Sequence, residues 1–307
     1  FYPESGGQVG DTGSLSADGT VVEVREVKRP VPGLVLHSVR VKRGTIEIGQ
    51  EVRAVVDGDR RRMTAKNHTA THLLHAALRQ TLGDHVKQAG SLVAPDRLRF
   101  DFPHFSPLTA REVDRIEELV NAQVWKNQAL TTEVMALDEA LGVGAMALFG
   151  EKYGERVRVV SVSDFSLELC GGTHVGATGE IGLFKVVSQG GVAAGTRRIE
   201  AVTGPGALQH VKREEQILAE AAARLKTRPQ DLVEKVEKLT EASRDLERKV
   251  QRLQGRLLGG TLERVLQGAT LVGGVRVVGA QVEAADSKGM RELGDRLREQ
   301  IGSGVVA

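Results

Sequence analysis

The stretch "KNHTATHLLHAAL", residues 66–78, places three histidines within eight positions of a run that is otherwise typical of a helix. A helix advances 100° per residue, so His68 and His72 lie about 40° apart on one face, with His75 about 20° to the other side of His68. The alanines and leucines lie on the opposite half and supply the core contact. The histidine face is therefore either a solvated polar surface or half of a metal site, because side chains four residues apart can reach one ion.

The composition limits the classes of partner that this chain can have. Its 307 residues exceed the usual length of one domain, and its net charge is only +2, so a nucleic acid would have to be bound by a local basic patch. Aromatic residues make up 3%, too few for a surface that reads sequence by stacking bases. One cysteine excludes an intrachain disulfide and favours a reducing, cytoplasmic compartment. No apolar run is long enough to predict a membrane span.

The first two regions predict an α+β multidomain fold. Residues 1–58 are punctuated by glycine and alternate between apolar and polar residues, which predicts a small antiparallel β-barrel. Residues 59–205 mix helices and strands and predict an α+β core. Within it, "TAREVDRIEELVNAQVWKN" opens with Thr109 and has Glu112 three residues later, the pattern of a capping box at a helix start.

The last two regions have a different character. Residues 206–266 carry leucines and valines at heptad spacing, and Pro229 divides them into two comparable lengths. A helical hairpin is the favoured interpretation, and a coiled coil that joins two chains is the alternative. Residues 267–307 predict a strand, a helix and the start of a strand at "SGVVA", which is the truncated start of an α/β C-terminal domain. The chain begins without a methionine, and we expect a piece of a longer protein.

A second pair of metal-binding residues lies far along the chain. The only cysteine, Cys170, is separated from His174 by three residues in "ELCGGTHVG", and the two glycines allow a tight turn. Together with His68 and His72, this pair offers three imidazole nitrogens and one thiolate, a set that suits one tetrahedral Zn²⁺. We expect His75 to have a structural role or to orient a ligand through a hydrogen bond.

These motifs resemble a known family. The stretches "FYPESGGQVGDTG", "NHTATHLLHAALR", "RFDF", "CGGTHV" and "AAGTRRIEAVTG" cover the first 205 or so residues almost continuously and are similar to the C-terminal part of the alanyl-tRNA synthetases. That part comprises an editing domain, a helical linker and the beginning of a C-terminal domain. The HxxxH and CxxxH pairing matches the zinc signature of the family. Related editing modules also occur as free-standing proteins and in threonyl-tRNA synthetases.

The resemblance implies zinc-dependent hydrolysis of mischarged Ser-tRNA(Ala) and Gly-tRNA(Ala). A pocket for alanine discriminates poorly against a change of one methyl, which is worth about 1–3 kcal/mol, so a second site has to read the serine hydroxyl. Thr71 and Gln88 match the positions that the family uses for this discrimination. No side chain stands out as a general base, so the nucleophile is expected to be a positioned or zinc-bound water. ATP and Mg²⁺ would serve alanine attachment in a missing upstream domain.

The expected partner is the acceptor end of tRNA(Ala), bound electrostatically. The candidate contacts are the residues of two local basic clusters, Arg60, Arg61, Arg62, Lys66, Arg197 and Arg198. A homodimer through the C-terminal region is possible. Two alternatives stay open: a zinc-stabilised module that binds tRNA or dimerises without hydrolysis, and a free-standing deacylase that edits in trans.

Overall fold

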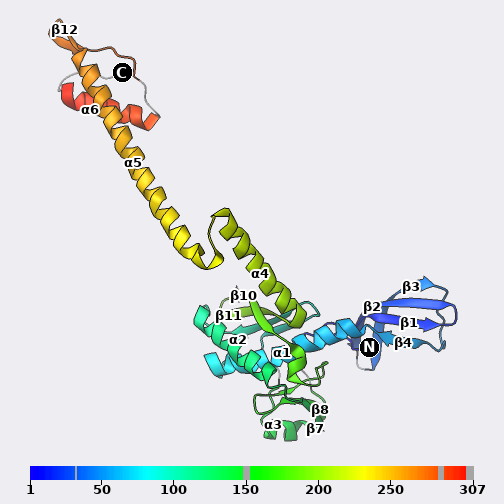
Figure 1. Cartoon of the computed structure of the whole chain (residues 1–307). Coiled ribbons are helices and arrows are strands. Elements are labelled where there is room, and N and C mark those ends of the chain that lie inside the picture. The colour runs from blue at the N-terminus through cyan, green and yellow to red at the C-terminus, as the bar shows by residue number, and fades with distance from the viewer. Residues whose placement is uncertain (32, 148–152, 283–286, 302–307) are drawn as a thin grey trace. The chain divides into compact units, whose positions relative to one another are not determined.

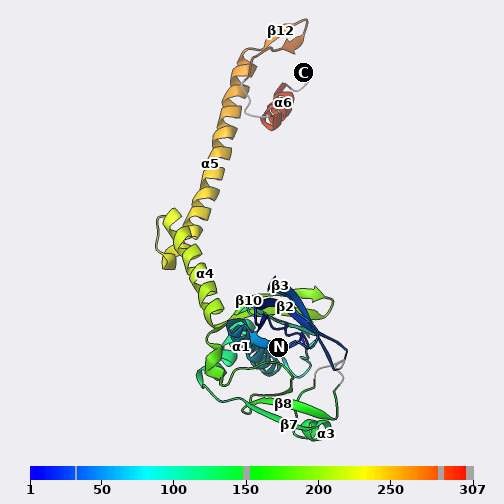
Figure 2. The same ribbon diagram turned by 90° about the vertical axis from the view of Figure 1, so that its right-hand side faces the viewer.

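The computed structural model describes residues 1–31, 33–147, 153–282 and 287–301, and it divides the chain into two compact units. The first unit is Phe1–Glu215 and the second is Gln216–Ala307. Figures 1 and 2 show their elements from two directions. No helix in the described part of the chain is long and apolar enough to span a membrane.

The N-terminal region forms an open four-stranded antiparallel sheet and not the expected closed barrel. The strand order is β3-β2-β1-β4, and the strands are β1 (Gly13–Ala17), β2 (Thr20–Val31), β3 (Leu34–Arg43) and β4 (Arg53–Val56). Among the described residues, the two edge strands β3 and β4 do not pair with each other. β4 is four residues long and pairs with β1 alone in the described part of the chain, so its outer edge stays unpaired and the sheet is open.

The core of the first unit is an antiparallel sheet covered by two helices. The sheet has the order β10-β11-β6-β5, and one of the helices is the predicted histidine helix. The bounds are α1 (Gly58–Leu82), α2 (Ala110–Trp125), β5 (Gly90–Val93), β6 (Leu98–Pro103), β10 (Phe184–Ala193) and β11 (Thr196–Thr203). Leucines of α1 pack here with Phe100 and Phe102 of β6 and with Ile116 of α2.

The helix α1 is enclosed on all sides, which the sequence pattern did not predict. Every residue from Asn67 to Leu78 is buried, so the histidine face is as inaccessible as the leucine face. A second small sheet contacts this helix through its strand β9. It has the order β7-β8-β9, and its elements are β7 (Thr131–Ala136), α3 (Leu137–Gly142), β8 (Arg156–Val162) and β9 (Ser166–Leu169). The three histidines of α1 therefore lie in the interior, and each needs a polar partner there.

The helical region consists of α4 (Gly204–Arg224), a 3₁₀ turn at Pro229–Asp231 and α5 (Leu232–Gln267). The break falls where the proline predicts it. The heptad residues of α5, Val236, Leu239, Leu246, Val250, Leu253 and Leu257, are exposed. Packing of this apolar stripe, as a hairpin or as a coiled coil between chains, stays a prediction.

The end of the second unit contains a β-hairpin where the sequence predicted a single strand. The single predicted strand is a short hairpin of β12 (Thr270–Val272) and β13 (Val275–Val277), which turns at two glycines with φ of 58° and 86°. The helix α6 (Ser287–Ile301) packs on α5 through Leu293 and Leu297. The strand predicted at residues 303–307 lies outside the described residues.

The predicted capping box at the start of α2 is confirmed and gives a test of local stability. The Glu112 N–H donates to Thr109 Oγ1 at 3.2 Å, and the Thr109 N–H donates to Glu112 Oε2 at 2.7 Å. We expect Thr109→Ala to lower the free energy of unfolding by about 1 kcal/mol in urea titrations, because two helix-end groups lose their partners. Arg111→Ala, at an exposed position of the same helix, should leave it nearly unchanged. Equal losses in both variants would contradict the role of the cap.

Candidate metal centre and cavity

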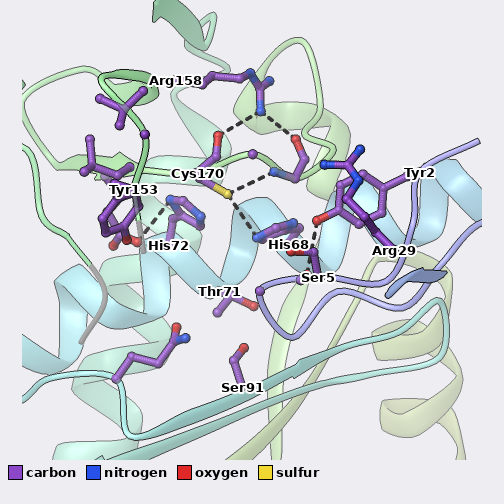
Figure 3. Close-up of a pocket in the computed structure, with 18 of the residues that line it drawn as sticks. Tyr2, Ser5, Arg29, His68, Thr71, His72, Ser91, Tyr153, Arg158 and Cys170 are labelled. Carbon is purple, nitrogen blue, oxygen red and sulfur yellow. Dashed lines mark hydrogen bonds and ion pairs between the residues drawn. The ribbon is translucent and has the colours of Figure 1, made fainter. Parts of the chain in front are cut away.

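The four predicted ligands come together in the first unit. His68 and His72 project from successive turns of α1 towards Cys170 in the loop after β9 (Figure 3), and His174 lies four residues further along this loop. One ligand atom from each of the four side chains lies within 4.8 Å of the other three. Cys170 Sγ is 3.4 Å from His68 Nε2 and 3.2 Å from His174 Nε2. Tetrahedral zinc spaces its ligand atoms roughly 3.3–3.8 Å apart, so the cluster needs little adjustment to hold that ion.

The loop can approach α1 this closely because residue 172 is glycine. A Cβ atom on Gly172 would lie 2.1 Å from the ring of His68 and 2.8 Å from Gln8 Oε1. Both of those groups belong to the cluster or support it, so neither can move aside freely. The "CGG" motif thus serves close packing in addition to the turn itself.

Hydrogen bonds fix the tautomer of His68. Its Nδ1 lies 2.6 Å from Gln8 Oε1, and the same oxygen accepts the backbone N–H of Thr173 at 2.9 Å. An atom that accepts a backbone N–H is an acceptor, so the histidine must donate from Nδ1. The lone pair of Nε2 is then free and points towards Cys170.

His174 is held in the same way by Thr69. Thr69 Oγ1 donates its single proton to the Ala65 carbonyl at 3.0 Å, and it lies 3.1 Å from His174 Nδ1. The hydroxyl has no second proton to give, so His174 donates from Nδ1 and presents Nε2 to the cluster. Burial, reinforced by the nearby His68, lowers the pKa of His174 to about 3, which keeps this ring neutral.

Glu168 joins the cluster to the third histidine of the helix. Its Oε2 lies 3.3 Å from His72 Nδ1, an ion-pair distance without hydrogen-bond alignment, and its Oε1 lies 3.0 Å from His75 Nδ1. Burial opposes the protonation of His72, but the charges of Glu168 and Cys170 outweigh it and raise the pKa of His72 to about 9. Burial also opposes ionisation of Glu168, yet the two histidines leave the pKa of its carboxyl below the usual value. His75 therefore acts on the cluster through a carboxylate.

The cysteine of the cluster has the character of a metal ligand. Burial disfavours its thiolate, but His68 and His72 more than compensate, and the pKa of Cys170 falls well below that of a free thiol. A thiolate with three imidazole nitrogens, each with a partner near its Nδ1, is the donor set that zinc prefers. The residues thus fit the predicted ion.

A cavity of about 400 Å³ opens beside the cluster. It is lined by His68, His72 and Cys170, and also by both residues predicted to read the substrate, Thr71 and Gln88. Thr71 Oγ1 donates to the Asn67 carbonyl at 2.8 Å, so its lone pairs are left to accept a hydrogen bond. His174 lines a different cavity, of about 320 Å³, on its own side of the cluster.

The six predicted tRNA contacts do not line the cavity beside the cluster. Arg61 is paired with Asp11, Arg62 with Asp59, and Arg198 with Asp101 through bonds of 2.7 and 2.8 Å; Arg197 donates to Gln189. Arg61, Arg62 and Lys66 line the cavity on the side of His174. Three of the six charges are thus balanced by carboxylates within the chain.

Two supporting residues were missed by the sequence analysis. Gln8 lies in the glycine-rich run near the N-terminus, 60 residues before its partner His68, and no local pattern connects them. Glu168 gave one weak signal, because it is a charged residue in the short strand "SLEL" directly before the only cysteine. Both act by orienting histidines.

Comparisons with known proteins first define a class. The family described as "Threonyl and Alanyl tRNA synthetase second additional domain" matches residues 157–200, which include Cys170 and His174. The family "tRNA synthetases class II (A)" matches residues 1–60. Two segments of the chain are thus similar to domains of tRNA synthetases.

The relatives narrow this class to one family. Alanine–tRNA ligases match over the whole chain, with 52% identity in Myxococcus xanthus, 48% in Acetivibrio thermocellus and 50% in Xanthomonas campestris pv. campestris. The match covers 100% of this chain and 34%, 35% and 35% of those relatives, respectively. The chain therefore belongs to the alanine–tRNA ligase family and spans about a third of the length of these relatives.

The carboxylate between two histidines leads to a prediction about metal affinity. Glu168→Gln removes the charge that holds His72 in place, so we expect zinc affinity to fall about 10–100-fold in competition with a chelator. Glu133→Gln, at an exposed position of β7, is the control and should bind zinc like the unmodified chain. Unchanged affinity in Glu168→Gln would show that the carboxylate serves only the fold.

Proposed function

We propose that this chain hydrolyses the ester that joins serine or glycine to the terminal adenosine of tRNA(Ala), with one zinc ion held by His68, His72, Cys170 and His174. The main support is that three of these ligands and the two candidate reading residues line one cavity. The attachment of alanine with ATP and Mg²⁺ is proposed for the full-length protein, outside this chain.

The residues of the cavity suit the recognition of a hydroxyl group. Because the Thr71 hydroxyl is already donating to a backbone carbonyl, it would accept a hydrogen bond from the serine side chain. Gln88 has a donor and an acceptor of its own and is half-buried. Alanine has no hydroxyl and would leave these groups unpaired, so they would favour serine over alanine; they do not account for glycine, which lacks a hydroxyl too.

The chemistry would rest on a water molecule. Zinc in this cluster would supply a Lewis acid that polarises the ester carbonyl or lowers the pKa of a water. Glu168 is the single carboxylate among the described residues that line the cavity, and both of its oxygens lie against histidines. It is therefore poorly placed to take a proton from the water, and its contribution is to hold His72.

Contacts with tRNA are proposed for the basic clusters, and a homodimer is proposed through the C-terminal region. Of the six candidates, the side chains of Lys66 and Arg60 form no hydrogen bond or ion pair within the described part of the chain. The other candidates would contribute mainly through their combined electrostatic potential, since they already have acidic or polar partners. They are Arg61, Arg62, Arg197 and Arg198.

The number of protein ligands in the cluster favours a second function, that of a module stabilised by structural zinc. A site with four protein ligands is typical of structural zinc, which would suit a module that binds tRNA or dimerises without hydrolysis. A free-standing deacylase that edits in trans would have the same cavity. Incubation of the chain with charged tRNA separates hydrolysis from binding alone.

We expect the chain to release serine from Ser-tRNA(Ala) and to leave Ala-tRNA(Ala) largely intact. Thr71→Val keeps the shape of the side chain and removes the hydroxyl, so serine release should slow about 10–100-fold, equivalent to one buried hydrogen bond. Zinc content should not change, which distinguishes this loss from loss of the metal. Cys170→Ala should lower zinc content and serine release together.

The matched control is Thr132→Val, at an exposed position of β7. Binding of tRNA without cleavage of either ester would favour the structural module. Full activity of Cys170→Ala without bound metal would exclude zinc from the reaction.

A further inference from the structure

The cavity beside the metal cluster has a positively charged mouth that the sequence did not reveal. Three arginines line it, Arg29 near the end of β2 and Arg156 and Arg158 on β8. Figure 3 shows Arg29 and Arg158. Glu168 is the single described carboxylate in the lining, and two histidines flank it. Among the described residues, no carboxylate pairs with these three arginines, in contrast to Arg61, Arg62 and Arg198.

The three arginines differ in what they can still bind. Arg158 is half-buried and donates to the carbonyls of Cys170 and Gly172, at 3.0 and 2.6 Å, so it secures the ligand loop. Arg156 is exposed and donates to the Val134 carbonyl at 2.9 Å. Arg29 is exposed and forms no hydrogen bond or ion pair within the described part of the chain. Its five N–H donors are all available.

A guanidinium that is free at the edge of a cavity is suited to bind phosphate, because its planar fork matches two phosphate oxygens. The opening is shared between two sheets, with Arg29 on the N-terminal sheet and Arg156 on the sheet of β8. A single-stranded RNA end that enters the cavity would pass between these two side chains. Its terminal nucleoside would lie inside, beside Thr71, and its preceding phosphates at the mouth.

We propose that Arg29, assisted by Arg156, binds the backbone phosphates that precede the terminal nucleoside of an aminoacylated RNA. This proposal rests on the proposed deacylase function, and it assigns the phosphate contacts at the cavity to residues outside the two basic clusters. Arg29 positions the 3′ end so that the ester lies beside the metal cluster. It does not touch the ester itself.

The test compares substrates with and without phosphates. For Ser-tRNA(Ala), Arg29→Ala should raise KM about 3–10-fold at unchanged kcat, and Arg29→Lys should restore part of the loss because it keeps the charge. For 3′-O-seryl adenosine, which has no phosphate, kcat/KM should be the same in both variants as in the unmodified chain. In a plot of log kcat/KM against log salt concentration, the slope for Arg29→Ala should be shallower by about 0.7 than that for the unmodified chain. This is the contribution of one phosphate contact with a single strand.

The matched control is Arg40→Ala. Arg40 is also exposed, lies on the neighbouring strand β3 and does not line the cavity, so the same charge is removed elsewhere on the sheet. If Arg29→Ala resembles Arg40→Ala on tRNA, or weakens cleavage of seryl adenosine equally, the phosphate contact is excluded.

A binding experiment separates this inference from the hydrolytic activity. The probes are two fluorescent RNA hairpins, one ending in a single-stranded CCA and one ending flush. Arg29→Ala should weaken binding of the first hairpin and not of the second. This holds even if the chain hydrolyses neither Ser-tRNA(Ala) nor Ala-tRNA(Ala). Equal binding of both hairpins by the unmodified chain and the variant would overturn the proposal, whereas failure of deacylation alone would overturn only the proposed function.

Discussion

The burial of α1 between two sheets is the constraint on which the rest of the first unit depends. A helix that is enclosed along Asn67–Leu78 has to satisfy every polar group that it brings inside. Asn67 bonds to the Ala94 carbonyl and to Thr203 Oγ1, and so ties the helix to two further segments. Gln8 accepts a hydrogen bond from His68, and Glu168 lies against His72 and His75, although His75 Nε2 has no hydrogen-bond partner among the described residues. The metal cluster is thus part of the same set of interactions that encloses the helix.

This arrangement explains why the orientation of the histidines is determined by segments that are far away in the sequence. The N-terminal loop supplies the acceptor for His68, the helix itself supplies Thr69 for His174, and β9 supplies the carboxylate for His72. Each ring directs Nδ1 outward and Nε2 inward. A site that is oriented before the ion binds loses less entropy on binding, which favours affinity.

The sequence predicted those features that depend on local patterns. The capping box gave the start of α2 to the residue, and the two short motifs around His68 and Cys170 gave all four members of the cluster. Features that depend on distant partners were not predictable. The closed barrel was wrong because β3 and β4 remain unpaired edges, and strand alternation alone does not specify which edges pair. The apolar stripe of α5 likewise specifies a packing surface without specifying its partner.

Which arginines are paired with carboxylates, and which are not, could not be predicted from the sequence. The run of arginines at residues 60–62 is the most obvious basic cluster in the sequence. However, Arg61 pairs with Asp11, 50 residues away, and Arg198 pairs with Asp101, 97 residues away. Pairing over such separations could not be predicted from the sequence. Arg29 is adjacent to only one other basic residue in "EVKRPV", and nothing there marks it out. It becomes significant because β2 ends at the opening of the cavity, where no carboxylate of the described chain pairs with it. With a net charge of only +2, the chain has no strong overall field, so its attraction for a phosphate backbone depends on where its unpaired cations lie.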